Sequence, residues 1–324
     1  MPAPAALRAA NREPGPGRAC PTSYRYPPKS LAREPELEAE AIYVAGGLYG
    51  NVEALDALLA LVGRERGRAA LVFNGDFHWF DVEPADFERV GRAALAHHAI
   101  RGNVETEIAG EESGAGCGCA YPADVGDADV ARSNEILARL RETARALPEL
   151  RRRQGDLAMN LVARVGEARV AIVHGDAASL AGWGFAHDRL DDPAHARWIE
   201  SAFADAGVDV FASSHTCLPA CRRFAFASGT GTVVNNGAAG MPNFAGTHFG
   251  VVTRIACEPA PGALYGVVER GVHVQALGLD YDAAAWKRRF LASWPEGSPA
   301  HDSYFRRIAG GPRHGLAEAL PKAA

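Results

Sequence analysis

Four polar residues, each following a short apolar run, are the part of this sequence best suited to chemistry. They are Asp76, Asn103, His174 and His215. A carboxylate, an amide oxygen and two imidazoles form a mixed oxygen and nitrogen donor set, which suits a borderline divalent ion such as Mn²⁺, Fe²⁺, Zn²⁺ or Ni²⁺. One such ion can polarise a phosphoryl oxygen and lower the pKa of a bound water from about 15.7 towards about 7. The set therefore predicts a divalent metal centre, with one ion expected and a second left open.

Cys217 is a further candidate donor at this centre because it lies two residues after His215. A thiolate is a softer ligand than imidazole and binds zinc at about 2.3 Å. Together with Asp76 and with either Tyr49 or His78, Cys217 could complete a second metal site. The alternative interpretation is that Cys217 is a small buried apolar residue, as most free cysteines are.

Other residues could serve the same centre, and each has a competing structural interpretation. Cys117 and Cys119 could donate sulfur, but they lack the Cys-x-x-Cys spacing typical of zinc sites. Arg101 could bind a substrate phosphate through paired N–H groups, although exposed arginines commonly pair with carboxylates instead. Trp183 could line a substrate pocket, although aromatic side chains are more often part of the core.

Repeated strand, turn and helix patterns are expected to position the four polar residues. The apolar run 41–45 leads through glycines into an amphipathic helical stretch at 51–64, and the pattern repeats with the run 70–73 and a helical stretch at 85–97. Short strand-like runs dominate the second half of the chain. In α/β sheets, functional sites lie outside the carboxyl ends of the strands. The pattern thus indicates an α/β fold with the polar residues gathered at one edge.

Composition suggests one large domain with tails. Residues 1–40 are rich in Pro, Ala, Arg and Glu, which predicts a flexible N-terminal arm, although 24–28 could dock on the domain. Residues 41–280 form the expected domain, with a cap-like insertion at about 106–150. Residues 281–324 form an expected helical or irregular extension.

Charge and hydropathy exclude some classes of partner and leave others open. A net charge of −5 over 324 residues provides no field that would attract nucleic acid nonspecifically. No apolar run reaches the roughly 18 residues that a membrane span requires, and the N-terminus lacks the apolar core of a signal peptide. We therefore expect a cytoplasmic protein without a membrane or nucleic-acid partner, and the sequence makes no prediction of its oligomeric state.

The polar segments resemble the motif series of calcineurin-like metallophosphoesterases, which reads Asp-x-His, Gly-Asp, Gly-Asn-(His)-(Asp/Glu), a later His, and Gly-His-x-His. Three of these motifs are present as Gly75-Asp76, Gly102-Asn103-Val104-Glu105 and His174-Gly175. The Gly-Asn-Val-Glu variant is similar to a bacterial phosphodiesterase-like branch of the superfamily. The resemblance covers about 41–256.

The departures from that pattern fall mainly on one metal ion. Gly47 and Tyr49 replace the Asp and His of the opening motif, and Cys217 replaces the last His. By the resemblance, these positions would hold the first ion, whereas the four polar residues would hold the second. Val104 stands where many relatives carry a His thought to protonate the leaving group, so the resemblance implies a missing general acid.

What the resemblance implies is a two-sheet β-sandwich flanked by helices and an enzyme that hydrolyses a phosphoester or phosphoanhydride with metal-activated water. Asp76, Asn103, His174 and His215 would be its catalytic metal ligands, and its substrate a small phosphorylated molecule. The alternative is a degenerate, non-catalytic scaffold or a regulatory metal-binding protein, because loss of the opening motif would disable most two-metal relatives.

Overall fold

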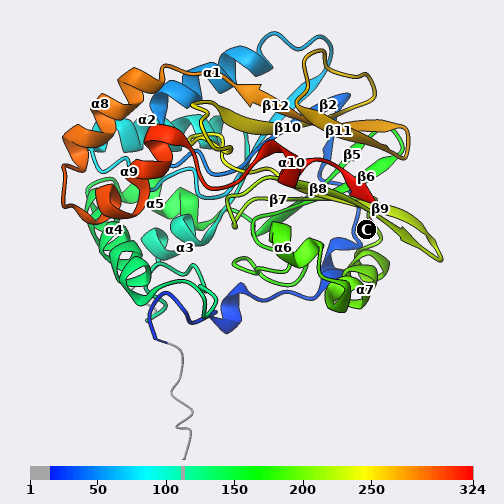
Figure 1. Ribbon diagram of the computed structural model, residues 1–324, viewed down its shortest axis with the longest axis horizontal. Helices are drawn as coiled ribbons and strands as arrows, with labels where there is room; N and C mark the ends of the chain where they lie inside the picture. The colour runs from blue at the N-terminus through cyan, green and yellow to red at the C-terminus, as the bar shows by residue number, and fades with distance from the viewer. Residues whose placement is uncertain (1–14, 111–113, 324) are drawn as a thin grey trace, which may run out of the picture.

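The computed structural model describes residues 15–110 and 114–323, and its strands form two stacked mixed sheets (Figure 1). One sheet contains, in spatial order, β1 (Leu37–Glu38), β5 (Asn160–Val165), β6 (Ala168–Val173), β7 (Val210–Ser213), β9 (Gly229–Asn235), β8 (Ala220–Phe226) and β13 (Lys322–Ala323). The other contains β11 (Tyr265–Glu269), β12 (Val272–Leu279), β10 (Gly250–Ala256), β2 (Ala41–Ala45), β3 (Ala69–Asn74) and β4 (His98–Ile100). This confirms the predicted two-sheet sandwich.

Apolar residues on both faces of the central strands explain why these strands read as continuous apolar runs. Ile42 and Val44 of β2 face the other sheet and pack with Val170 and Ile172 of β6. The intervening Tyr43 packs instead under the helices on the outer face. Strands covered on both faces need no polar alternation, and in β3 and β6 the buried residues that precede the strand end are apolar.

Helices cover both outer faces and one end of the sandwich (Figure 1). On the outer face of β2 and β3 lie α1 (Val52–Val62) and α2 (Pro84–Ala96), and on the opposite face lies α7 (Ala196–Ala206). A helical group at one end comprises α3 (Asn103–Ala109), α4 (Asp127–Arg145), α5 (Pro148–Gly155), α8 (Ala283–Ser293) and α9 (Pro299–Gly310). The expected insertion and extension therefore pack on one another, α4 against α9. Short helices α6 (His187–Leu190) and α10 (Leu316–Ala319) lie near β8 and β9.

The expected flexible arm differs from the structure over residues 15–40, which pack against the domain. Tyr24 is buried and donates a hydrogen bond from its hydroxyl to Glu107 Oε1 at 2.7 Å. Leu31 is buried beside α7, and β1 pairs in parallel with β5. Buried aromatic and leucine anchors therefore outweigh the polar composition, while residues 1–14 lie outside the described residues.

None of the helices in the described part of the chain combines the length and the hydropathy that crossing a membrane requires.

Candidate metal centre

The four predicted ligands converge where strands of both sheets end. Asp76 and Asn103 follow β3 and β4 of one sheet, whereas His174 and His215 follow β6 and β7 of the other. His174 Nε2 lies 3.3 Å from Asp76 Oδ2, 3.2 Å from Asn103 Oδ1 and 3.2 Å from His215 Nδ1. The edge of the sandwich thus brings together residues that are far apart in sequence.

Each amide or imidazole N–H of these ligands points away from the point of convergence, towards a backbone carbonyl. His174 Nδ1 donates to Asn74 at 2.8 Å, and Asn103 Nδ2 donates to Cys117 at 2.9 Å. His215 Nε2 donates to Cys119 at 2.9 Å. These bonds fix the ring tautomers and the amide orientation, as partners behind metal ligands commonly do.

The convergent atoms are consequently hydrogen-bond acceptors, which can donate electron pairs to a metal ion. Asp76 Oδ2, Asn103 Oδ1 and His215 Nδ1 each lie 3.2–3.3 Å from His174 Nε2, an arrangement that a metal ion among them, or a proton on His174, relieves. Burial and the neighbouring His174 ring lower the pKa of His215 to about 4, so its ring is neutral at pH 7 and its Nδ1 lone pair is available. The residues present therefore fit a divalent metal ion.

Left-handed backbone and close packing place Asp76 in this cluster. Its φ is +49°, and that of Gly75 is +74°. A Cβ at Gly75 would lie 2.5 Å from His174 Nδ1, and one at Gly102 would lie 2.2 Å from Asp76 Oδ1. The two motif glycines are thus required by the close approach of the ligands.

Glu105 holds this turn in place and was not singled out as a site residue from the sequence. Its Oε2 accepts the backbone N–H groups of Asp76 and Gly102, each at 2.8 Å, and its Oε1 accepts that of Phe77 at 3.1 Å. The carboxylate therefore orients the ligand loop without binding metal. The sequence signal that could have identified Glu105 is its position in the Gly-Asn-Val-Glu segment.

Replacing Glu105 with Gln is expected to lower the free energy of unfolding by about 2–4 kcal/mol, because the amide NH₂ would face buried N–H donors that cost about 1–3 kcal/mol each when unsatisfied. The affinity for metal should fall together with the free energy of unfolding. Urea unfolding and a metal titration measure both effects, with the exposed Glu142→Gln as the control. Equal free energies of unfolding for Glu105→Gln and Glu142→Gln would contradict the assignment of Glu105 as the residue that orients this turn.

Tyr49 occupies the space beside the cluster where the opening motif of the resembled family would place its ligands. A Cβ at Gly47 would lie 2.0 Å from Tyr49 Cζ, so the ring fills the position of a side chain at residue 47. Tyr49 Oη and Cys217 Sγ are hydrogen-bonded at 2.7 Å. Burial raises the pKa of both groups, which keeps the hydroxyl and the thiol neutral. In the structure, Cys217 therefore pairs with Tyr49, and it does not belong to the group of Asp76, His174 and His215.

His78 and Arg101 do not lie in the cluster, which corrects two expectations. Both ring nitrogens of His78 have partners, Asp81 Oδ2 at 2.6 Å and Gln154 Nε2 at 2.7 Å, and its ring stacks on Phe87. Arg101 donates from Nη1 to the Gly155 carbonyl, and it does not line the pocket described below. These side chains stabilise the surroundings of the turn.

Cys117 and Cys119 contribute backbone carbonyls to the centre. Cys117 accepts from Asn103, while the Cys119 carbonyl accepts from both His215 Nε2 and Trp183 Nε1, the latter at 3.0 Å. The Cys119 thiol lies 3.6 Å from Asn103 Nδ2, behind that ligand. The loop that carries both cysteines therefore supports the ligands from outside.

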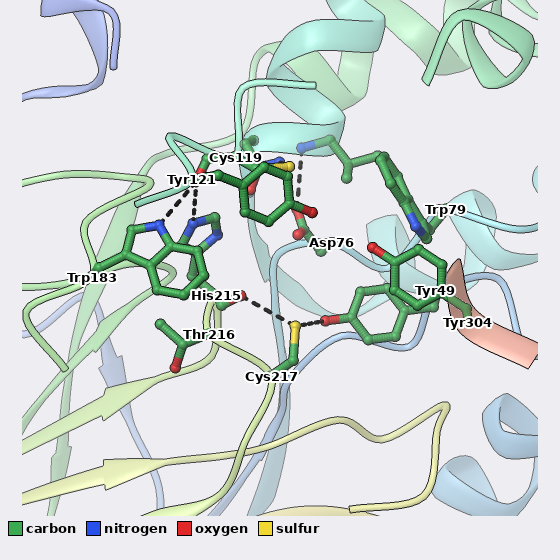
Figure 2. Close-up of a pocket in the computed structure, with 12 residues that line it drawn as sticks. Tyr49, Asp76, Trp79, Cys119, Tyr121, Trp183, His215, Thr216, Cys217 and Tyr304 are labelled. Carbon is green, nitrogen blue, oxygen red and sulfur yellow. Dashed lines mark hydrogen bonds between the residues drawn. The ribbon is translucent and has the colours of Figure 1, made fainter. Parts of the chain in front are cut away.

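A cavity of about 170 Å³ opens beside the cluster and is largely aromatic. In Figure 2, Trp183 and His215 lie on one side of the view and Trp79, Tyr49 and Tyr304 on the other, with Asp76 between them. Its lining also includes Tyr121, Val104 and Cys217. None of the described residues that line it is Lys or Arg. The sequence offered no signal for Tyr121 or Tyr304, because they reach the pocket from a loop and from α9.

Comparison with known proteins supports the fold. No family model and no curated protein matches this sequence. A hypothetical protein from Pyrococcus horikoshii OT3 is similar over 84% of this chain and 99% of its own, with 17% identity and a TM-score of 0.57. A metallophosphoesterase from Sphaerobacter thermophilus is similar over 85% of this chain and 100% of its own, with 17% identity and a TM-score of 0.50. The chain therefore has a metallophosphoesterase-type fold.

Proposed function

We propose that this protein hydrolyses a small phosphoester with one divalent metal ion held by Asp76, Asn103, His174 and His215. The observation that carries the proposal is the convergence of hydrogen-bond acceptor atoms from four residues, while the Asn103 amide and both histidine rings donate outward to backbone carbonyls. A bound divalent ion supplies Lewis acidity towards a phosphoryl oxygen and a water molecule. Mn²⁺, Fe²⁺, Zn²⁺ and Ni²⁺ suit this donor set.

The pocket favours a phosphodiester over a phosphomonoester. A monoester is mostly a dianion at pH 7 and is usually held by Arg or Lys, yet no described residue that lines the cavity is either one. Arg307, which lies beside Cys217, donates to the carbonyls of Cys217 and Pro242. A diester carries one negative charge, and its organic group could pack on Trp79, Trp183 and the pocket tyrosines.

The pocket residues also predict a preference for good leaving groups. Val104, which lines the pocket, has no proton to donate. Burial raises the pKa of Tyr49, Tyr121 and Tyr304, which makes these hydroxyls poor acids at neutral pH. The leaving group must then depart with little protonation, so its own acidity should control the rate.

Metal removal tests the proposal. We expect protein purified without chelator to carry divalent metal and to hydrolyse bis(p-nitrophenyl) phosphate faster than p-nitrophenyl phosphate. Chelation should abolish turnover, and Mn²⁺ or Zn²⁺ should restore it. Aryl diesters with less acidic phenols should react progressively more slowly. The measurements are elemental analysis and initial rates.

A second candidate function is metal binding without turnover, as a scaffold or regulatory protein. The placement of the Tyr49 ring favours it, because that ring fills the space that a side chain at residue 47 would need, where the resembled family carries a ligand of the first ion. Bound metal combined with no chelator-sensitive hydrolysis of either aryl ester would decide for this candidate and against the enzyme.

A further inference from the structure

A second cluster of metal-ligating side chains lies outside the candidate centre and shares no residue with it. It consists of His187, at the start of α6, and of His314 and Glu318, which precede and lie within α10. One ligand atom from each of the three residues lies within 4.8 Å of the other two. The cluster thus joins two segments more than a hundred residues apart in sequence.

The His314 ring has a buried nitrogen for which the described part of the chain supplies no hydrogen-bond partner. The residue is 1% exposed, and its Nε2 donates to the Pro219 carbonyl at 2.9 Å. This bond leaves the lone pair on Nδ1, which is buried and has no hydrogen-bond partner among residues 15–110 and 114–323. Nδ1 lies 3.8 Å from Glu318 Oε1, too far for a hydrogen bond. An unsatisfied buried acceptor of this kind is uncommon and requires an explanation.

Glu318 and His187 each place a possible ligand atom close to that of His314. Glu318 accepts the Gly315 N–H with Oε2 at 2.6 Å, which leaves Oε1 facing His314. The His187 ring stands edge-on to the His314 ring, with centroids 5.0 Å apart.

We propose that His187, His314 and Glu318 bind a zinc ion. Two imidazoles and one carboxylate are a common zinc donor set, with bonds of about 2.0–2.2 Å and water as the fourth ligand of a tetrahedron. Tetrahedral bonds of that length separate ligand atoms by about 3.3 Å, close to the 3.8 Å between His314 and Glu318. Small movements of the half-buried His187 and the exposed Glu318 close the site.

The zinc ion would hold together segments of the chain that border the pocket. His187 follows the loop that carries Trp183, and Pro219, bonded to His314, follows Cys217. The C-terminal segment is also held by Arg222, which donates to the carbonyls of Glu318 and Leu320. Zinc at this point would therefore fix the end of the chain against the loops on either side of His215.

Zinc counting in the wild-type chain and five variants tests this site independently of catalysis. After chelation and equilibration with Zn²⁺, we expect two ions per wild-type chain, one in His187→Ala, one in Asp76→Asn and none in the double variant. Glu318→Gln should weaken the second site by more than about 100-fold, since even residues behind metal ligands contribute 10–100-fold. His248→Ala, which alters an exposed histidine outside both clusters, is the control and should retain two ions.

A stability readout separates metal binding from a packing role of the same residues. Zinc should raise the Tm of Asp76→Asn and leave the Tm of the double variant unchanged. Co²⁺ in place of zinc should give visible absorption typical of a tetrahedral site, lost with His187→Ala. Unchanged zinc content and an unchanged Tm response in both His187→Ala and Glu318→Gln would overturn the proposal, whatever the result at Asp76.

Discussion

Asp76→Asn is expected to lose bound metal and to lower kcat/KM for bis(p-nitrophenyl) phosphate by at least about 100-fold, more than variants behind metal ligands commonly lose. Asp76 is the only carboxylate in the acceptor cluster, and its Oδ2 lies 3.3 Å from His174 Nε2. An amide there supplies no negative charge to offset a divalent cation. Elemental analysis, initial rates and the Tm of the same preparations give the result.

Asparagine is the informative substitution because of the backbone at this position. Asp76 has a φ of +49°, a conformation in which Asn is enriched and Ala is strained. The Asn side chain can still accept the Val104 N–H, which lies 3.1 Å from Asp76 Oδ1. Loss of activity in Asp76→Asn would therefore report on metal binding, since the turn itself is preserved.

The matched control is Asp176→Asn. Asp176 lies two residues after His174, is buried, and accepts the backbone N–H groups of Ala178, Ser179 and Gly184, but it is not part of the metal-ligand group. We expect it to keep its metal while losing some stability. Hydrolysis by Asp76→Asn at the wild-type rate would contradict the assignment of Asp76 as a ligand. Equal metal loss in Asp76→Asn and Asp176→Asn would contradict it as well.

The convergence of the four polar residues was predictable in part from local sequence. In β3 and β6 the buried residues are apolar up to the strand end, so the polar residues that follow them mark where these strands end. Parallel pairing of β6 with β7 and of β3 with β4 then aligns these ends. The position of Asp76 and His174 at one edge could therefore be predicted from the strand pattern, and the resemblance added their role as ligands, whereas His78 lies elsewhere because its turn directs the ring towards Asp81 and Gln154.

Contacts between distant segments could not be predicted in the same way. The Cys119 carbonyl supports His215 across 96 positions, and Tyr304 reaches the pocket from α9. The burial of Tyr24 depends on Glu107, 83 positions away, so composition alone suggested a flexible arm. Backbone carbonyls carry no sequence signal, because every residue has one.

The structure also allows a test of the first metal site that the resemblance implies. Gly47→Asp alone should be destabilising, by about 1–3 kcal/mol or more, because its Cβ would lie 2.0 Å from the Tyr49 ring. The variant should bind no additional metal. Its free energy of unfolding in urea and its metal content measure these effects.

Combining Gly47→Asp with Tyr49→His and Cys217→His should instead be tolerated. Tyr49 and Cys217 have φ values of +55° and +62°, and His is among the non-glycine residues enriched there. Removing the tyrosine ring frees the space that the new side chain at residue 47 requires. Asp76 would then lie between two ligand sets, as in two-metal sites that stabilise both the attacking and the leaving oxygen.

We therefore expect the triple variant to gain one metal ion per chain relative to wild type and to hydrolyse aryl diesters at least about tenfold faster, a gain of about 1.4 kcal/mol in transition-state stabilisation. Tyr49→His alone is the matched control, because it removes the ring without supplying the other ligands. The His187→Ala background keeps ions at the second cluster out of the count. A folded triple variant with unchanged metal content would contradict the proposal that the Tyr49 ring stands in for metal ligands. The resemblance of residues 47–51 to the opening motif would then not indicate a metal site.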